Sequence, residues 1–224
     1  LPAAASDILG DKTTVEGLVH LPYALPHRRT EHVLTHAPVP VGFWRSVGHS
    51  HNAFFAESFV DECAASAKID PVEFRRALLA NAPRHREVLP VAAAKAGWGA
   101  PLPAGTGRGI ALAESFRSIV AQVAEVEVKD GAVRVWRVVC VIDCGFAVNP
   151  NVIRQQVESA IVYGLSAALH GEVTIEDGRV VQSNFHDYPA LRIDECPAIE
   201  TAIIDSAEHP EGVGEPGLPP IAPA

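Results

Sequence analysis

Apolar and polar side chains alternate with a period of two through the middle of the chain, which is the spacing of a β-strand. Three successive runs follow this pattern, over residues 109–115, 119–128 and 132–143. The tripeptide Lys-Asp-Gly at 129–131 separates the last two runs and supplies a hairpin turn. The pattern therefore predicts three strands, the last two joined as a hairpin.

Two further strand-like segments follow later in the chain. Residues 172–185 indicate a second hairpin, with Asp177 and Gly178 at its turn, and residues 198–205 indicate one more strand. A helical segment lies between these strands and the first three, so some strands are joined by hairpin turns and others through a helix. We expect a mostly antiparallel or mixed sheet.

Apolar positions three to four residues apart predict four helices, over residues 57–68, 70–81, 86–97 and 149–171. The second has a strong start signal, because Asp70 can be the N-cap, Pro71 fits the first helical position and Glu73 completes a capping box. The last helix has a continuous apolar stripe. Its members are Ile153, Val157, Ala160, Ile161, Gly164, Leu165 and Ala168.

The remaining segments are rich in residues that favour loops. Residues 1–40 predict loops with short strands, and the Gly- and Pro-rich stretch 96–109, including its GTGRG sequence, predicts a linker. We therefore expect an α+β fold of layered sheets and packed helices, divided into a loop-rich and helical part, 1–97, and a sheet-plus-helix part, 98–224.

Composition excludes several classes of protein. The chain has 224 residues, 48% of them hydrophobic, which is enough for a sizeable core. Its net charge of −9 argues against binding nucleic acid, and its apolar stretches are too short to predict a membrane span. Four cysteines do not make a disulfide scaffold, and Cys63, Cys140 and Cys144 are expected to pack in the core. Because the chain contains no Met, we expect it to be a processed subunit or a piece of a longer polypeptide.

Common enzyme motifs do not account for the chain. It has no phosphate loop, no GxSxG nucleophile elbow and no HExxH or CxxC metal motif. The pair Cys140 and Cys144 has too few partners for a metal site. His49 and His51 leave a hydrolase as a weaker alternative.

Three stretches combine polar residues with glycine or apolar neighbours. Arg45 follows Phe43 and Trp44 and suits recognition of an anion or carbonyl, or else forms a surface ion pair. Gln155 and Gln156 lie near a helix start, where a Gln can bond a cofactor, or else belong to a solvated helix face.

The third stretch is GVGEP, residues 212–216. Gly212 and Gly214 can adopt positive φ and allow a ligand to approach the backbone, while Pro216 favours extended geometry at Glu215. A carboxylate in such surroundings can accept a proton as a general base. The alternative is that Glu215 is a solvated residue of a tail.

Together these stretches resemble the molybdenum hydroxylase family, which contains xanthine oxidase and aldehyde oxidase. They are most similar to the molybdopterin-binding large subunit of isoquinoline-oxidoreductase-like enzymes, and the resemblance runs from about residue 13 to the end. The segments that carry it, in the family's order, are VPVGFWRSVGHSHNAFFAESFVDE (39–62), VIDCGFAVNPNVIRQQVESAIVYGL (141–165), QSNFHDYP (182–189) and GVGEPGLPPIAPA (212–224).

The resemblance implies roles for individual residues. Glu215 matches the family's catalytic base, Arg45 matches an arginine near metal and substrate, and Gln156 matches the glutamine that contacts the pterin. Gly214 would lie beside the metal. Ser159 stands where the family motif commonly has Gly.

The family's aromatic substrate wall is only partly visible. Phe116 is a candidate for it, and Val47 stands where some members carry an aromatic residue.

The resemblance also implies cofactors and partners. These are molybdopterin as the cytosine dinucleotide with molybdenum, the rest of the large subunit, a small [2Fe-2S] subunit, and a cytochrome or flavin as electron acceptor. The implied reaction is hydroxylation of an N-heteroaromatic compound or an aldehyde with water as the oxygen source. A non-catalytic structural fragment is the alternative, and both bacterial cytoplasm and periplasm stay open as locations.

Overall fold

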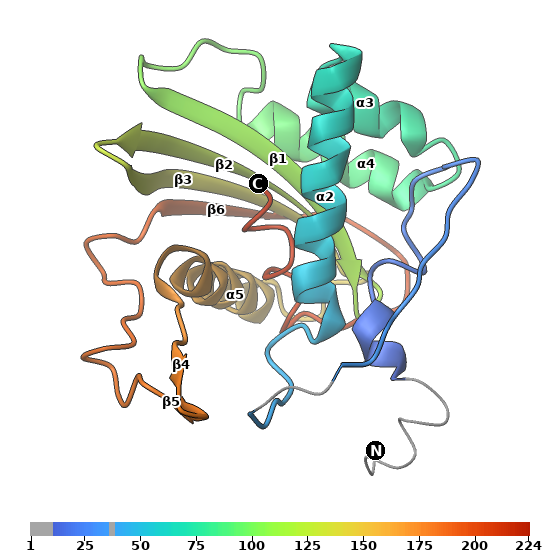
Figure 1. The fold of residues 1–224 in the computed structure, drawn as a ribbon. Helices are drawn as coiled ribbons and strands as arrows, with labels where there is room; N and C mark the ends of the chain where they lie inside the picture. The colour runs from blue at the N-terminus through green and yellow to red at the C-terminus, as the bar shows by residue number, and fades with distance from the viewer. Residues whose placement is uncertain (1–10, 36–38) are drawn as a thin grey trace.

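A four-stranded sheet between helical layers forms the framework of the protein (Figure 1). The computed structural model describes residues 11–35 and 39–224. The helices are the 3-10 helix η1 (Lys12–Val15), α2 (Gly48–Ala67), α3 (Pro71–Leu78), α4 (Pro83–Lys95) and α5 (Pro150–His170). The strands are β1 (Thr106–Ser115), β2 (Ser118–Lys129), β3 (Ala132–Asp143), β4 (Ile175–Glu176), β5 (Arg179–Val180) and β6 (Ala198–Ile203).

The large sheet is mixed, in the order β1-β2-β3-β6. Strands β1, β2 and β3 form an antiparallel meander, and β6 pairs with β3 in parallel after the crossover through α5. Asp130 and Gly131 both have positive φ at the turn between β2 and β3, as a two-residue hairpin requires. The expected α+β fold with a mixed sheet is therefore confirmed.

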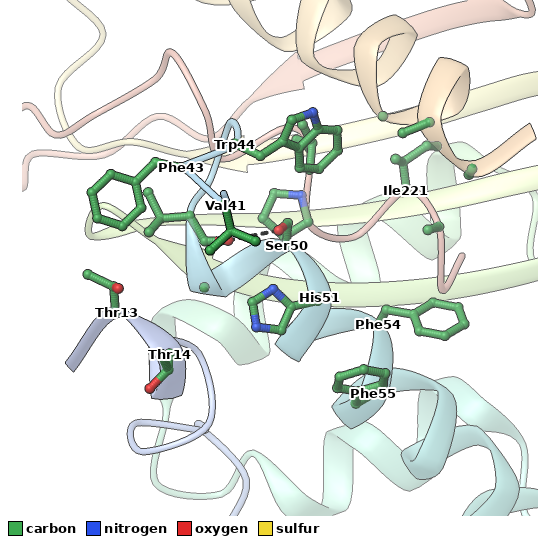
Figure 2. A pocket seen from close by; sticks show the side chains of 18 of the residues that line it. Thr13, Thr14, Val41, Phe43, Trp44, Ser50, His51, Phe54, Phe55 and Ile221 are labelled. Atoms are coloured by element: carbon green, nitrogen blue, oxygen red, sulfur yellow. Dashed lines mark hydrogen bonds between the residues drawn. The ribbon is translucent and has the colours of Figure 1, made fainter. Parts of the chain in front are cut away.

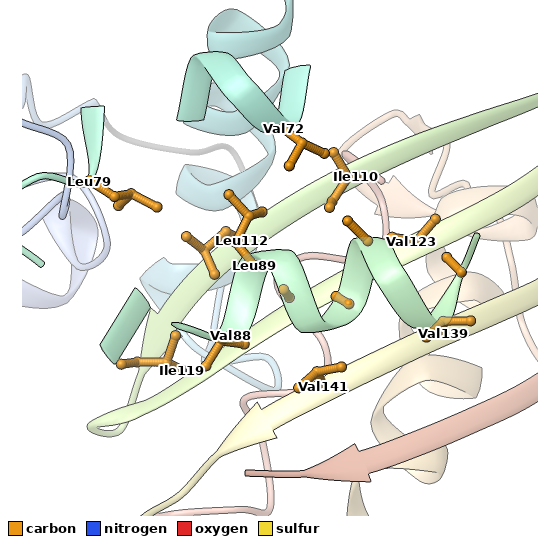
Figure 3. Close-up of a cluster of buried hydrophobic side chains, with 14 of the residues drawn as sticks. Val72, Leu79, Val88, Leu89, Ile110, Leu112, Ile119, Val123, Val139 and Val141 are labelled. Atoms are coloured by element: carbon orange, nitrogen blue, oxygen red, sulfur yellow. The ribbon is translucent and has the colours of Figure 1, made fainter. Parts of the chain in front are cut away.

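Both faces of the sheet are covered. Helix α4 lies on one face, where Val88 and Leu89 pack against residues such as Val123 and Val141 (Figure 3). Helix α5 lies on the other face, where Val157 packs with Val138 and its neighbours. Because α4 comes from the first expected part and the sheet from the second, the two parts share one core. The boundary at 97/98 itself stays a prediction.

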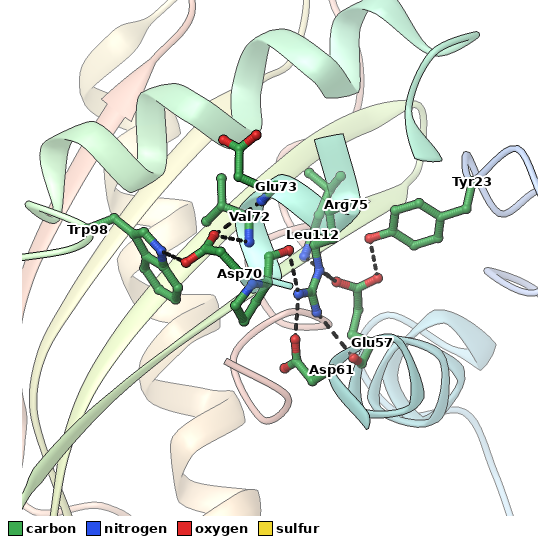
Figure 4. A network of polar contacts seen from close by, with 10 residues as sticks. Tyr23, Glu57, Asp61, Asp70, Val72, Glu73, Arg75, Trp98 and Leu112 are labelled. Carbon is green, nitrogen blue, oxygen red and sulfur yellow. Dashed lines mark hydrogen bonds and ion pairs between the residues drawn. The ribbon is translucent and has the colours of Figure 1, made fainter. Parts of the chain in front are cut away.

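A buried ion-pair network ties α2 to α3 and β1 (Figure 4). Arg75 Nε donates to Glu57 Oε2 at 2.9 Å, and its Nη1 donates to Asp61 at 2.5 Å. Glu57 also accepts from Leu112 N at 2.8 Å and from the Tyr23 hydroxyl at 2.7 Å. Burial alone would lower the pKa of Arg75, but the Glu57 carboxylate holds it above its usual range.

Several predicted boundaries are wrong because distant contacts decide them. Helix α2 begins nine residues before the expected start at 57, where Asn52 Nδ2 donates to the backbone oxygens of Thr14 and Glu16. Strand β1 begins at Thr106, inside the stretch predicted as a linker. Gly109 in that strand leaves room for the backbone of Ala224, whose oxygen would lie 2.3 Å from an added Cβ.

Smaller differences concern the other elements. Helix α4 begins at Pro83 rather than 86 and continues through Pro90, while α3 ends at Leu78 rather than 81. Asp70 caps α3 as predicted, but the Glu73 carboxylate accepts from Arg76 instead of completing the capping box. The predicted hairpin over 172–185 is reduced to the short pair β4 and β5.

The expected short strands of residues 1–40 are replaced by η1 and loops where that region is described, and residues 1–10 and 36–38 lie outside the described residues. Cys140 and Cys144 are buried, Cys63 is half-buried and Cys196 is exposed, and these cysteines are unpaired. None of the helices described combines the length and apolar character needed to cross a bilayer.

Candidate active site around Glu215

The sheet holds the C-terminal segment that contains Glu215. Ser118 Oγ donates to Gly212 O at 2.7 Å, and Gly212 N donates to Phe116 O at 3.3 Å. Further along, Gln122 Nε2 donates to Gly217 O at 2.7 Å from a fully buried position in β2. The segment is therefore fixed to the β1–β2 hairpin and is not a solvated tail.

Helix α5 supplies the other wall of this segment. An added Cβ at Gly217 would lie 3.1 Å from both Ala160 Cβ and Val157 O. An added Cβ at Gly164 would lie 2.5 Å from Ile221. The predicted apolar stripe of α5 is buried over its first six members, and only Ala168 is exposed. Small residues thus allow the chain after Glu215 to lie directly on the helix.

Arg45 joins the segment to α5. Its Nε donates to Gly214 O at 2.9 Å, and its Nη2 also donates to that oxygen. Its other contacts are with α5, to Ser159 Oγ at 3.2 Å and to Gln156 O at 3.4 Å. Ser159, the residue that departs from the family motif, thereby gives the guanidinium a partner that Gly could not offer.

Ser46 makes two hydrogen bonds to Glu215, one to its side chain and one to its backbone. Its backbone N donates to Glu215 Oε1 at 3.1 Å, and its hydroxyl donates to Glu215 O at 2.8 Å. Ser46 and Val47 both have positive φ, at 72° and 48°. A β-branched residue there is strained, and such strain is concentrated at functional sites. The strained turn thus aims the Ser46 N–H at the carboxylate, which is half-buried.

Gln156 and Gly214 form the part of the site that fits a cofactor. Gln156 Oε1 would lie 3.8 Å from an added Cβ at Gly214, so the glutamine side chain borders this glycine. The structure gives no hydrogen-bond partner to the Gln156 side-chain amide among the residues it describes. Contrary to expectation, Gly212 and Gly214 do not have positive φ. They contribute to the site by having no side chain, which leaves the backbone open to a ligand. A free amide beside an open backbone suits the donors and acceptors of a pterin.

The two candidates for the substrate wall face different hollows. Val47 lines a hollow of about 1120 Å³ together with Phe43, Trp44, His51 and Phe55 (Figure 2). Phe116 lines a second hollow of about 720 Å³, between η1, α2 and the β1–β2 turn. The structure therefore separates Val47 from Phe116, and their substrate role stays a prediction.

Phe116, like Val47, has an unusual backbone geometry. Phe116 and Arg117 both have positive φ at the two-residue turn between β1 and β2, where Asn and Gly are the usual residues. Phe116 is 40% exposed, and its ring lies 5.8 Å from the His49 ring. A strained aromatic residue directly beside the Glu215 segment is consistent with a functional constraint.

Some residues of the site were not found by reading the sequence. Gln122 had a usable signal, since it is the single polar residue in the apolar run IVAQVA of a strand. Ser46 and Ser118 had none, because their partners lie 169 and 94 residues away. In the described chain no group of three or more His, Cys, Asp or Glu is arranged to hold a metal ion.

Comparison with known proteins identifies the family. Two family models, both described as a molybdopterin cofactor-binding domain, match residues 3–79 and 80–197. The chain is 34% identical over 207 residues to the beta subunit of isoquinoline 1-oxidoreductase of Brevundimonas diminuta, covering 90% of this chain and 26% of that protein. It is 32% identical over 244 residues to a nicotinate dehydrogenase subunit of Pseudomonas putida, covering 100% of this chain and 20% of that protein.

A solved structure shows the same fold. The aldehyde oxidoreductase of Desulfovibrio desulfuricans matches with a TM-score of 0.64 at 14% identity, over 81% of this chain and 38% of that one. The chain spans only about a quarter of the length of the curated relatives it matches. On the family models and these relatives, the chain belongs to the molybdenum hydroxylase family and corresponds to its molybdopterin cofactor-binding region.

Proposed function

We propose that this chain supplies the general base and part of the cofactor-binding surface of a molybdenum hydroxylase. The proposed reaction is hydroxylation of an N-heteroaromatic compound or an aldehyde, with water as the oxygen source. The observation that carries the proposal is the double anchoring of the Gly214–Glu215 backbone by Arg45 and Ser46, which fixes the Glu215 carboxylate next in sequence to the glycine that borders the Gln156 side-chain amide.

Each residue has a separate task in this proposal. Gln156 and Gly214 hold the pterin, and molybdopterin with molybdenum supplies the two-electron oxidation when it is bound. Glu215 Oε1 accepts from the Ser46 backbone, so the carboxylate is oriented and its second oxygen is left to take the proton. Arg45 acts through Gly214, because its donors are directed at Gly214 O, Gln156 O and the Ser159 hydroxyl and not at open space.

An N-heteroaromatic substrate is the better supported of the two classes. Two of the relatives are named for isoquinoline and nicotinate, whereas a third, 31% identical, is named a membrane-bound aldehyde dehydrogenase of Gluconacetobacter polyoxogenes. Phe116 offers a ring face to a planar substrate next to the Glu215 segment.

The remaining components belong to partner chains in this proposal. The relatives carry subunit names and are about four to five times as long as the matched region, which supports a further part of the large subunit. A small [2Fe-2S] subunit would take the electrons and pass them to a cytochrome or a flavin. We propose the cytosine dinucleotide form of molybdopterin as the cofactor.

Substitution of Glu215 by Gln in the assembled enzyme tests the proposal. The amide oxygen can still accept from Ser46 N, so folding and molybdenum content should be unchanged. Turnover should fall by about 10²–10⁴-fold, the usual contribution of a general base. Glu211→Gln is the matched control, since Glu211 lies in the same segment but pairs with Arg117 at 3.3 Å.

Two results would contradict the proposal. Retention of more than about a tenth of parental turnover by Glu215→Gln would remove the base role from Glu215. Absence of stoichiometric molybdenum from the assembled protein, measured by mass spectrometry of the metal, would favour the non-catalytic fragment.

A further inference from the structure

Gln122 is a fully buried polar side chain in the middle of β2, on the face of the sheet that α5 covers. Its neighbour across the sheet, Cys140 on β3, packs with the apolar residues of α5. Gln122 Nε2 donates to Gly217 O at 2.7 Å and lies 3.5 Å from Cys140 Sγ. Gln122 Oε1 is buried and has no hydrogen-bond partner among the described residues. The amide therefore makes one strong hydrogen bond, to Gly217, and leaves its own oxygen unpaired.

The contribution of Gln122 is its hold on Gly217 O and not its packing. A buried amide oxygen without a donor costs free energy, because it gives up its hydrogen bonds to water on folding. An apolar side chain of similar length would fill the same space without that cost. It would, however, leave Gly217 O without the donor that the glutamine supplies.

Gly217 belongs to a tight turn that begins at Glu215. Leu218 N donates to Glu215 O at 3.0 Å, which closes a four-residue turn with Pro216 and Gly217 at its centre. Pro216 has a fixed φ, so the turn is stiff. Glu215 O also accepts from the Ser46 hydroxyl at 2.8 Å. A rotation of the Gly217 peptide therefore moves the backbone from which the Glu215 side chain projects.

We propose that Gln122 is a positioning residue for the base, and this rests on the proposed function. Arg45 and Ser46 hold the backbone up to Glu215. Gln122 holds the turn that follows Glu215, from a strand that is itself paired on both sides. It acts through Gly217 and takes no part in the chemistry. Its hold keeps the Glu215 carboxylate where it can accept the proton.

Gln122→Met in the assembled enzyme tests this role, because methionine has a similar length but no donor. The kcat should fall about 10–100-fold, the scale expected when a reacting group is displaced by up to about 1 Å. The KM should stay unchanged, because no contact with the substrate is lost. Val123→Ala is the matched control, since Val123 is the next residue of β2 but is buried on the other face, among the residues of α4. It removes core volume without removing the donor, so its kcat should be parental.

Gln122→Glu supplies or withdraws the donor according to pH. A buried carboxyl group has a raised pKa, and in its protonated form it can donate to Gly217 O. Its kcat should be near parental below that pKa and should fall as the pH rises through it, because a carboxylate has no proton to donate and repels the carbonyl oxygen. The ratio of variant to parental kcat is compared only where circular dichroism shows the variant to be folded. Val123→Ala should show no such dependence on pH.

Hydrogen exchange tests the hold on Glu215 without turnover. The Ser46 N–H donates to Glu215 Oε1, and Ser46 lies on a different segment from Gln122. If Gln122 positions Glu215, this N–H should exchange several-fold faster in Gln122→Met than in the parent or in Val123→Ala. Mass spectrometry of peptides that span residue 46, taken from the assembled protein, measures it.

The outcomes separate the positioning role from the proposed function. Parental kcat in Gln122→Met, or an equal loss in Val123→Ala, overturns the positioning role. Unchanged exchange at Ser46 also overturns it, and so does a Gln122→Glu variant whose kcat relative to the parent does not vary with pH. Should Gln122→Met fail to fold, Gln122→Glu at low pH carries the test. Faster exchange at Ser46 together with full turnover in Glu215→Gln overturns the proposed function instead.

Discussion

Replacing Arg75 by Met should destabilise the protein strongly, because it leaves a buried carboxylate without its cation. Arg75 is fully buried, and its guanidinium contacts Glu57, Asp61 and backbone oxygens on α2 and α3. Without it, Glu57 keeps the donors Tyr23 OH and Leu112 N but loses the only cation paired with it in the described chain. Methionine fills a similar length of space, so the loss is mainly electrostatic.

The magnitude follows from the burial of the pair. Removing one partner of a buried ion pair costs about 3–5 kcal/mol, a large share of the roughly 5–15 kcal/mol that holds a domain folded. For a domain of this size, that corresponds to a melting temperature lower by about 6–20 °C. The neighbouring Arg76→Met removes a pair whose side chains are 51% and 53% exposed, so its effect should be about 1 kcal/mol or less.

Thermal and urea unfolding of Arg75→Met, Arg76→Met and the double variant Arg75→Met/Glu57→Gln measure the effect. In the double variant the uncharged amide still accepts from Leu112 N, so it should recover part of the lost stability. Equal unfolding free energies for Arg75→Met and Arg76→Met would refute the reasoning, because burial would then make no difference.

Three further outcomes are expected. Arg45→Lys should lower turnover of the assembled enzyme while the protein stays folded, because lysine keeps the charge but cannot contact Gly214 O with two donors of a planar guanidinium. Unchanged kinetics would leave Arg45 without a role in the site. Burial would raise the pKa of Asp143, but Arg84 at 2.7 Å holds that pKa below its usual value, so the ion pair adds stability above about pH 4 that is lost as the pH falls through the lowered pKa. Arg84→Met should therefore reduce the loss of unfolding free energy at acid pH, and an unchanged pH dependence of unfolding would contradict this linkage. Phe55 and Phe59 are 59% and 63% exposed and lie one turn apart on α2, so the isolated chain should self-associate or bind a hydrophobic dye. The double variant Phe55→Ser/Phe59→Ser should reduce both self-association and dye binding, and a monodisperse isolated chain that binds no dye would contradict an exposed apolar face.

The elements that the sequence predicts well are those whose pattern is local. The runs of β2 and β3 and the stripe of α5 follow directly from periods of two and of 3.6 residues. Helix α2 was predicted too short because Gly48 to Asn52 contains no apolar repeat, and its start depends on Asn52 bonding to Thr14 and Glu16. No window of neighbouring residues contains that information.

The same limit applies to the candidate site. The GVGEP motif pointed to Glu215, but the donor that orients its carboxylate is a backbone N–H, which no side-chain pattern reveals. Gly214, Arg45 and Gln156 do meet in space, and their roles stay a prediction. What the sequence could not supply was the direction of the arginine, whose donors are directed at Gly214 O and at helix α5.

The positive-φ turn at Ser46 and Val47 affects how the protein folds. Positive φ is unfavourable at Ser46 and Val47, so the turn becomes stable only after Glu215, 169 residues later in the sequence, has formed its hydrogen bonds with Ser46. Closing so long a loop is slow and belongs near the end of folding, after the sheet and its helices have condensed. Substitutions at these contacts should therefore leave the rate of folding nearly unchanged and accelerate unfolding, with φ-values near zero. The candidate site around Glu215 would then be the last part of the domain to form and the first to open.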